Sequence, residues 1–409
     1  MEAPKSTADR FIELEERYGA HNYKPLPVVL ERGAGIYVWD VNGKRYFDFL
    51  SAYSAVNQGH CHPNIVAALT RQASVLTLTS RAFFNSSLGE FEAYITSYFG
   101  YEKVLPMNTG AEAVETAIKL ARKWGYEKKG IPSGKAKIIV CERNFHGRTV
   151  NIISFSSDPE TQNNFGPFTP GYEIIPFNDL KALEKLALDP NVAGFLVEPI
   201  QGEAGVIVPN DGYLEKAFEI CRRNNVLFIA DEIQTGLCRT GKMLACDWEN
   251  VHPDILILGK ALSGGMLPVS AVLATDEIMS CILPGQHGST YGGNSLASKV
   301  AMAALAVLKD ENLAERANEL GEILRAGLRA INSPFIKEVR GRGFLNAIEI
   351  NEKKGITAWG ICLKLADEGI LAKTTHGNII RLAPPLIMNN HQLSECIELI
   401  HSVFQKLDI

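Results

Sequence analysis

Residues 254–265 read Asp254-Ile255-Leu256-Ile257-Leu258-Gly259-Lys260-Ala261-Leu262-Ser263-Gly264-Gly265, an apolar run that leads to a lysine and is followed by glycines. Four consecutive apolar residues between turn-forming residues are typical of a buried strand. Lys260 then lies where that strand ends, and parallel α/β sheets bind ligands at the carboxyl ends of their strands. A lysine there is partly desolvated, which favours its neutral amine, and a neutral amine can form a Schiff base with a carbonyl group. A single lysine at such a position is usually only solvated, so the assignment depends on the residues around it.

The composition excludes several classes of protein. With 409 residues the chain is long enough for two or three domains and a large core. Its net charge of -5 gives no electrostatic footprint for nucleic acid or for an anionic membrane surface. No apolar run approaches the length of a membrane span. We therefore expect neither a nucleic-acid partner nor a membrane.

The cysteines and histidines indicate a reducing compartment and no metal. The eight cysteines are scattered and form no C-x-x-C pair, which argues against disulfides and structural zinc. The segment Met1–Pro4 is neither a signal peptide nor an Arg-rich transit peptide, so we expect a cytoplasmic protein, or a mitochondrial matrix protein if a presequence was removed. His60, Cys61 and His62 fit no standard zinc spacing and have no second cluster, so we expect a tight loop that enters a helix over 63–74.

The order of the expected elements indicates a mixed α/β chain. Asn42-Gly43 lies between two β-rich runs, 36–41 and 44–49, and predicts a hairpin. From about residue 80, strands alternate with helices. The strands are expected at 104–107, 137–141, 172–177, 194–198, 226–230, 255–258 and 269–274. Beyond them we expect helices at 296–309, 311–330, 357–369 and 390–406, a strand-rich stretch at 335–350 and a strand at 378–382.

Several side chains could surround Lys260. Asp231 ends a buried strand and needs a partner, because an unpaired buried charge is costly. Lys260 follows 29 residues later at the end of the next strand, and adjacent parallel strands would bring both residues to one edge of the sheet. Gly110 and Ala111 open a helix, where free N–H groups suit a phosphate, although Thr109 also fits a simple N-cap.

This set meets the requirements of pyridoxal phosphate. Its aldehyde needs a lysine such as Lys260, and its ring nitrogen needs an aspartate such as Asp231 to stay protonated. Its phosphate needs N–H donors without bulk, and Phe145, in a loop after a strand, offers a stacking face for the ring.

A second motif points to a different class of protein. Gly236–Lys242 matches the first seven positions of a P-loop, G-x-x-x-x-G-K. The eighth position is Met243, which has no hydroxyl for Mg²⁺, and five residues separate the strand from the first glycine. A nucleotide-binding protein therefore stays a remote alternative.

Motifs along nearly the whole chain carry a resemblance to one enzyme family. They are Tyr18–Tyr23 (YGAHNY), Ser51–Pro63 (SAYSAVNQGHCHP), Asn108–Glu112 (NTGAE), Phe145–Thr149 (FHGRT), Val197–Gly205 (VEPIQGEAG), Ala230–Gly236 (ADEIQTG), Leu258–Gly265 (LGKALSGG) and Gly288–Asn294 (GSTYGGN). In them the chain resembles the class III (ω-amino acid) aminotransferases of fold-type I. The first two motifs point to the branch of that family that acts on ornithine.

The resemblance implies an α/β fold with two domains. The large domain would hold a mostly parallel seven-stranded sheet flanked by helices, and a small α+β domain would be built from both termini. Residues 1–53 would then form the N-terminal segment of the small domain, residues 54–300 the large cofactor-binding domain, and residues 301–409 the C-terminal part of the small domain.

The resemblance also implies how pyridoxal 5'-phosphate is bound. Lys260 would hold the cofactor covalently and move the proton between the substrate and the cofactor. Asp231 would pair with the pyridinium nitrogen, Gln234 would hydrogen-bond the phenolic oxygen, and Phe145 would stack on the ring.

The phosphate would be shared between two subunits. Gly110 and Ala111 would bind it from one chain, and Ser289 and Thr290 would reach across from the partner. The active sites would then lie at the interface of an obligatory homodimer.

The implied reaction is δ-transamination of L-ornithine with 2-oxoglutarate, which gives glutamate-5-semialdehyde and glutamate by a ping-pong route through a pyridoxamine form. Arg148 would bind the α-carboxylate of ornithine, and Tyr23 and Tyr53 would hold its α-amino acid end. Arg381 would bind the second carboxylate of 2-oxoglutarate. Glu203 would mask Arg381 during the first half-reaction and release it for the second.

One residue departs from some relatives, and related activities stay open. His146 stands where some relatives carry tryptophan, so we expect a changed pocket wall without loss of activity. An N-acetylornithine or 4-aminobutyrate aminotransferase would share Lys260 and Asp231, and Tyr23 and Tyr53 are what favour free ornithine. A non-catalytic scaffold would be expected to have lost Lys260 or Asp231.

Overall fold

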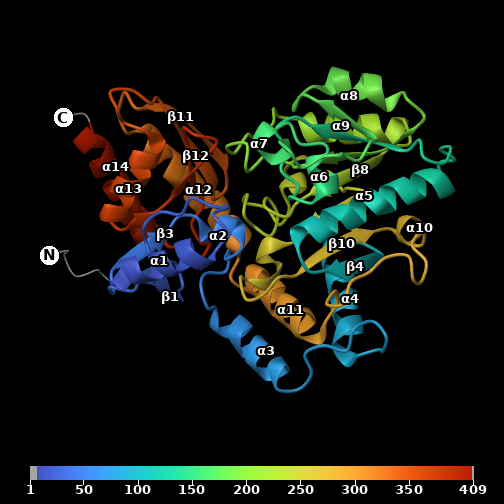
Figure 1. Cartoon of the computed structure of the whole chain (residues 1–409), viewed down its shortest axis with the longest axis horizontal. Coiled ribbons are helices and arrows are strands. Elements are labelled where there is room, and N and C mark those ends of the chain that lie inside the picture. Colours follow the sequence, from blue (N-terminus) through green and yellow to red (C-terminus); the bar gives the residue numbers. More distant parts are fainter. Residues whose placement is uncertain (1–6, 408–409) are drawn as a thin grey trace.

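The computed structural model describes residues 7–407 and is built around one seven-stranded sheet (Figure 1). The strands lie in the order β4-β10-β9-β8-β7-β5-β6. β10 is antiparallel to both of its neighbours, whereas all pairs from β9 to β6 are parallel. The expected mostly parallel sheet is therefore confirmed. Its strands are β4 (Lys103–Met107), β5 (Lys137–Cys141), β6 (Tyr172–Ile175), β7 (Val192–Val197), β8 (Leu227–Asp231), β9 (Ile255–Leu258) and β10 (Ser270–Ala274).

Both faces of this sheet are covered, which explains why its central strands are apolar throughout. Successive side chains of a strand point to opposite faces. On β8, Ile229 packs in the cluster that contains α5 (Gly110–Glu127), while Phe228 packs in the cluster of α8 (Leu180–Ala187) and α9 (Tyr213–Arg223). Figure 1 shows α5 crossing one face, with α8 and α9 on the other. A strand buried on both faces has no polar side, as the runs at β7, β8 and β9 indicated.

Two four-stranded sheets lie at one end of the molecule, on the left in Figure 1. The first has the order β1-β2-β3-β13 and contains the predicted antiparallel hairpin around Asn42-Gly43. The second has the order β11-β12-β15-β14. The strands are β1 (Leu30–Ala34), β2 (Tyr37–Asp40), β3 (Arg45–Asp48), β11 (Ile336–Arg342), β12 (Leu345–Ile350), β13 (Ile370–Leu371), β14 (Lys373–Thr375) and β15 (Ile379–Leu382). Because β13 pairs with β3, segments from the two ends of the chain share a sheet. We propose that the domain boundaries lie at residues 53 and 300. The pairing of β3 with β13 supports a small domain built from both ends of the chain.

The remaining helices agree with the expected pattern. The helices expected at 63–74, 296–309, 311–330, 357–369 and 390–406 are present. They are α3 (Pro63–Ala73), α11 (Ser295–Asp310), α12 (Leu313–Arg329), α13 (Ala358–Asp367) and α14 (Asn390–Leu407). The others are α1 (Thr7–Tyr18), α2 (Ser51–Ser54), α4 (Ser86–Phe99), α6 (Val150–Ile153), α7 (Pro159–Gln162), α10 (Asp276–Met279) and the short 3₁₀ helices η1 (Ala245–Glu249) and η2 (Lys260–Ser263).

The N-terminal segment and the membrane prediction are considered next to the described helices. The expectation about Met1–Pro4 lies outside the described residues. Within residues 7–407, none of the helices combines the length and the hydropathy that a bilayer-crossing helix needs.

The P-loop alternative is wrong, because Gly236–Lys242 does not wrap around a helix N-terminus. The segment runs through turns into η1, which is a single short 3₁₀ helix. The Arg239 side chain is fully buried and donates to Asn57 Oδ1 and to the carbonyl oxygens of Phe344 and Pro384. The Lys242 amine lies 5.4 Å from the centre of the Trp248 ring. These residues join distant parts of the chain and leave no loop for a phosphate.

Candidate active site

Lys260 and Asp231 meet at one edge of the large sheet, as the sequence predicts. β8 and β9 are adjacent and parallel, and Asp231 is paired with Ile257, three residues before Lys260. Lys260 opens η2 with a φ of 44°, in the left-handed region that a non-glycine residue rarely adopts. Burial lowers the pKa of the Lys260 amine below its usual range; the charge of Glu203 opposes this effect and that of Arg381 adds to it. The neutral amine needed for attack on a carbonyl is thus favoured.

A cavity of about 210 Å³ lies above this edge of the sheet. It brings together all the expected cofactor residues except those of the glycine-rich loop. Its lining includes Gly110, Ala111, Phe145, Asp231, Gln234 and Lys260. The Gln234 Oε1 atom is buried without a hydrogen-bond partner among the described residues. An orphaned buried acceptor is uncommon in proteins. This one lies against Gly202, where a Cβ would collide with it.

The N-terminus of α5 forms one end of the cavity. Thr109 caps the helix: its Oγ1 accepts from the Glu112 N–H, and the Glu112 carboxylate accepts from the N–H groups of Asn108 and Thr109. The N-cap is therefore present, and the phosphate site at the first helical N–H groups, those of Gly110 and Ala111, stays a prediction. A Cβ on Gly110 would lie 3.1 Å from the Ile233 side chain, so a larger residue here would crowd Ile233.

The cavity fits pyridoxal phosphate. The group requires an amine for its aldehyde, an acid for its ring nitrogen and a cradle of N–H donors for its phosphate. Lys260, Asp231 and the α5 N-terminus supply these three features around one cavity. At the base of the cavity the Asp231 side chain is only 4% exposed, so a group bound there would be held out of bulk water.

Sequence reasoning missed the partners of Asp231. Its Oδ2 atom lies 2.6 Å from His146 Nδ1, and its Oδ1 atom accepts from the Ile233 N–H at 3.1 Å. Burial disfavours the imidazolium form of His146, but the hydrogen bond and the charge of Asp231 outweigh burial and raise its pKa. His146 is thus a hydrogen-bond partner that holds the aspartate in place, rather than only a pocket wall. The sequence feature that could have indicated this role is the position of His146 directly after Phe145, the residue expected to stack on the ring.

Glu198 is a second residue that the sequence did not single out. It follows β7, is buried beside the cavity and accepts from the N–H groups of Phe145 (2.9 Å) and Gly202 (3.3 Å). Burial raises the pKa of its carboxyl to about 7, although the charge of His146 opposes that shift. Its two hydrogen bonds tie the Phe145 loop to the loop that carries Glu203. The sequence feature that could have indicated Glu198 is its position at the end of a fully buried strand.

Glu203 and Arg381 form a direct ion pair. The Arg381 Nη1 atom lies 2.6 Å from Glu203 Oε1, and Gln234 Nε2 donates to the same oxygen at 2.9 Å. Burial opposes ionisation of Glu203, but the charges of Arg381 and Lys260 and the hydrogen bonds from Arg381 and Gln234 together outweigh it and lower the pKa of Glu203 to about 2. The Thr375 hydroxyl donates to the Glu203 carbonyl oxygen and anchors this loop on β14. Arg381 lies on β15 and is 2% exposed, as expected for an anchored guanidinium.

Tyr53 reaches this pair from an unusual turn. Its ring centre lies 4.7 Å from the Arg381 guanidinium carbon. Ser51, Ala52, Tyr53 and Ser54 all have positive φ, so α2 is a left-handed turn that costs roughly 1–2 kcal/mol per residue. Asp48 Oδ1 holds its start by accepting from the N–H groups of Leu50 and Ser51. Strain of this kind is concentrated at functional sites.

Other expected site residues lie outside the cavity. The Arg148 guanidinium carbon is 5.6 Å from the centre of the Phe145 ring, at the exposed side of the loop. Tyr23 is 69% exposed. Ser289 accepts from Asn108 Nδ2 of the same chain at 3.0 Å. The contribution of Ser289 and Thr290 to a partner subunit, and the contact of Tyr23 with substrate, stay predictions.

Comparison with known proteins gives one consistent result. Residues 18–404 match the model of the family described as aminotransferase class-III. The chain is 62% identical to "Ornithine aminotransferase, mitochondrial" of Drosophila melanogaster over 398 residues, which are 97% of this chain and 92% of that protein. It is similar to an ornithine aminotransferase structure from Toxoplasma gondii, crystallised with oxidized glutathione and described as having partial occupancy of PLP at the active site (TM-score 0.97, 51% identity, 98% of this chain and 95% of that one). It is also similar to the structure of an acetylornithine aminotransferase from Elizabethkingia anophelis (TM-score 0.92, 61% identity, 98% of this chain and 100% of that one). With its sheet, its lysine-aspartate cavity and a family match over nearly its whole length, the chain belongs to the class-III aminotransferases.

Proposed function

We propose that the protein is a pyridoxal-phosphate-dependent aminotransferase that moves the δ-amino group of L-ornithine to 2-oxoglutarate, giving glutamate-5-semialdehyde and glutamate. The observation that carries this proposal is the Glu203–Arg381 ion pair beside the Lys260 amine. A donor with an α-amino acid end needs that arginine masked, and a diacid acceptor needs it free. The names of the fruit-fly and Toxoplasma relatives support ornithine as the donor.

When bound, the cofactor would act as an electron sink and carry the amino group between the two half-reactions. Gly110 and Ala111 would bind its phosphate, Phe145 would cover its ring, and Gln234 would lie at its phenolic oxygen. Asp231, fixed by His146, would keep the ring nitrogen protonated. Lys260 would hold the aldehyde carbon and, once released, move a proton to and from the substrate carbon.

The charged side chains around the cavity would determine how each substrate binds. The exposed Arg148 guanidinium would bind the α-carboxylate of ornithine and leave the δ-amine to reach the cavity. While Glu203 neutralises Arg381, that guanidinium does not attract the α-carboxylate, so the α-amine is kept from the reacting position. Rotation of the Glu203 side chain away from Arg381 would expose the guanidinium for 2-oxoglutarate.

Glu203→Ala is expected to raise transamination of the α-amine of glutamate relative to ornithine turnover. A hydrogen-bonded charge pair contributes about 1.5–3 kcal/mol, so the ratio of the two kcat/KM values should change on the order of tenfold or more. The measurement is the rate of each half-reaction, followed by absorbance, with either amino acid.

Glu184→Ala is the control, because Glu184 pairs with Arg223 on the outer helices. It should leave the ratio unchanged. An unchanged ratio in the Glu203 variant would contradict the gating role.

We infer that the enzyme is a homodimer whose active sites are shared. Phe83 and Phe84 lie on the surface with exposed fractions of 73% and 103%, and Tyr291, in the glycine-rich loop, is 59% exposed. Large exposed aromatic side chains are typical of interfaces. Ser289 and Thr290 lie next to Tyr291, so a partner seated on these aromatic residues would be close to the residues expected to complete its phosphate site.

We also infer a reducing compartment, the cytoplasm or the mitochondrial matrix. The eight cysteines are all free, and seven of them are buried. The compartment is tested by imaging the full-length natural protein in its own cells.

The test of the function is the visible absorption spectrum of the purified protein with L-ornithine, N-acetylornithine or 4-aminobutyrate. We expect a yellow protein that bleaches with ornithine and recovers its colour with 2-oxoglutarate. The relative named acetylornithine aminotransferase makes N-acetylornithine the second candidate. Bleaching with N-acetylornithine alone would move the donor to that compound, and a colourless protein that stays so after addition of pyridoxal phosphate would contradict the whole proposal.

A further inference from the structure

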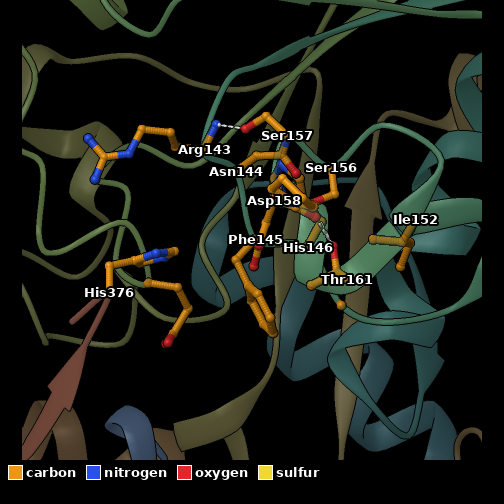
Figure 2. Close-up of a pocket in the computed structure, with 13 residues that line it drawn as sticks. Arg143, Asn144, Phe145, His146, Ile152, Ser156, Ser157, Asp158, Thr161 and His376 are labelled. Carbon is orange, nitrogen blue, oxygen red and sulfur yellow. Dashed lines mark hydrogen bonds between the residues drawn. The ribbon is translucent and has the colours of Figure 1, made fainter. Parts of the chain in front are cut away.

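A second hollow of about 210 Å³ opens beside the cofactor cavity (Figure 2). The two share Phe145, His146 and Gly147 as lining residues, so the hollow leads directly to the ring-stacking position. Glu203 also lines it. In Figure 2, Arg143 and His376 lie on one side of this hollow, and Ile152 and Thr161 lie on the other.

Arg143 is held in position by its surroundings. Its φ is 57°, and its N–H donates to Ser157 Oγ at 2.6 Å. Its Nη2 atom donates to the carbonyl oxygen of Ala204 at 2.8 Å, next to Glu203 in sequence. The guanidinium is therefore bound to the loop that carries the Arg381 partner, although the side chain is exposed. A charge fixed at this place acts on every molecule that enters the hollow.

His376 belongs to the same rim. It lies in the tight turn between β14 and β15, with a φ of 44°, and follows Thr375, which anchors the Glu203 loop. Arg143 and His376 also line a larger adjoining hollow of about 620 Å³. We call Arg143 and His376 the rim pair.

Most carboxylates around the rim pair are bound to cations other than Arg143, and Arg143 itself forms no ion pair among the described residues. The larger hollow also contains Arg329 and Arg340, with Glu338 and Glu349. Both of these glutamates are bound to Arg340, at 2.6 and 2.7 Å, and Glu349 is bound to Lys337 as well.

On the active-site side of the rim, Glu203 is paired with Arg381. Asp158, on the far wall of the first hollow, is engaged as the N-cap of α7. A guanidinium without an ion-pair partner at this entrance, on a chain with a net charge of -5, would draw anions toward one place.

We propose that the rim pair selects for the dicarboxylate acceptor: Arg143, assisted by His376, draws a doubly negative keto acid into the active site and disfavours the positively charged diamine donor. This inference rests on the proposed function and adds to it a residue that contacts neither the reacting atoms nor the bound carboxylates. The acceptor carries two negative charges, whereas a diamino monocarboxylate carries a net positive charge at neutral pH. One fixed cation therefore changes the two encounters in opposite directions.

The experiment measures the two half-reactions separately, by absorbance, on the holoenzyme. Arg143→Asn removes the charge, and asparagine tolerates the left-handed backbone. At an ionic strength of about 10 mM we expect kcat/KM for 2-oxoglutarate to fall about three- to fivefold, and that for ornithine to stay constant or rise up to about twofold. At about 0.5 M salt both differences should vanish, because charges beyond a few ångströms are then screened.

Three further variants complete the test. Arg143→Lys keeps the charge and should behave as the wild type, and His376→Asn should lower kcat/KM for the acceptor by a smaller factor than Arg143→Asn. Arg222→Asn is the matched control, because Arg222 is an exposed arginine on α9, which packs with α8 on the sheet face away from α5. It should change neither half-reaction.

The outcomes separate this proposal from the proposed function. An equal, salt-independent fall of both half-reactions in Arg143→Asn would show that Arg143 only shapes its loop and would overturn the proposal, as would an unchanged acceptor half-reaction. If the wild type reacts with another amine instead of ornithine, the donor assignment fails while the acceptor half-reaction still tests the rim. A wild type that turns over monocarboxylate keto acids as fast as 2-oxoglutarate would overturn the rim proposal and would also count against the role of Arg381.

Discussion

Replacing Lys260 by alanine is expected to lower turnover by a factor on the order of 10⁴, the upper range for loss of a general acid–base group. Lys260 is the lysine in the lining of the cofactor cavity, and its lowered pKa favours the neutral amine. The variant would lose the covalent link to the cofactor and the group that moves the proton. Single-turnover absorbance measurements with ornithine would quantify the loss.

Two additional measurements test that the effect is chemical. A small primary amine added to the Lys260→Ala protein should restore part of the rate, because it can carry the proton in place of the side chain. Lys242→Ala, which removes an amine packed on Trp248, should leave turnover unchanged. A Lys260→Ala protein with more than about a tenth of wild-type turnover would remove this residue from the centre of the mechanism.

Replacing Asp231 by asparagine is expected to lower kcat by a factor on the order of 10² to 10³, the range for loss of one preorganised electrostatic partner. The carboxylate is held on both oxygens, by His146 at 2.6 Å and by the Ile233 N–H at 3.1 Å. An amide of the same shape can accept from the Ile233 N–H with its oxygen and donate its N–H to the unprotonated Nδ1 of a neutral His146. It cannot keep the negative charge that holds a proton on the ring nitrogen of the cofactor. Cofactor affinity should fall as well, which equilibrium dialysis measures without any turnover.

Glu232→Gln is a matched control in the neighbouring residue. Glu232 is fully buried, and burial raises the pKa of its carboxyl to about 7. It accepts from Thr235 Oγ1 and the Cys246 N–H and is absent from the lining of the cavity, so a neutral amide should keep kcat within about twofold. Equal losses in the Asp231 and Glu232 variants would indicate disruption of the β8 terminus instead of loss of a charge at the cofactor.

The large sheet could be predicted because its signals are local. Each of its central strands is an apolar run between turn-forming residues, and the run length and the following motif are visible in a few residues. The boundaries moved by one or two residues; Asp231, expected just after a strand, is the last residue of β8. Strand ends depend on which N–H and C=O groups find partners in the neighbouring strand, and a single segment does not contain that information.

The sequence by itself determined the α/β class, the strand–helix alternation, and the meeting of Lys260 and Asp231 at one sheet edge. The last followed because parallel neighbouring strands end at the same edge, whatever the rest of the chain does. Through the family motifs it also indicated Gly110, Ala111, Phe145 and Gln234, which line the same cavity.

Only the tertiary structure decided how the charged groups are paired. Glu203 and Arg381 are 178 residues apart, and His146 and Asp231 are 85 apart. Their contacts depend on the packing of separate strands and loops, because a hydrogen bond requires side chains to meet within about 3 Å. The left-handed turn at Tyr53 is likewise held by Asp48 and by packing rather than by local preference, which disfavours it. The sequence thus specified which chemical groups the site contains, and the folded chain specified which of them are charged, masked or exposed.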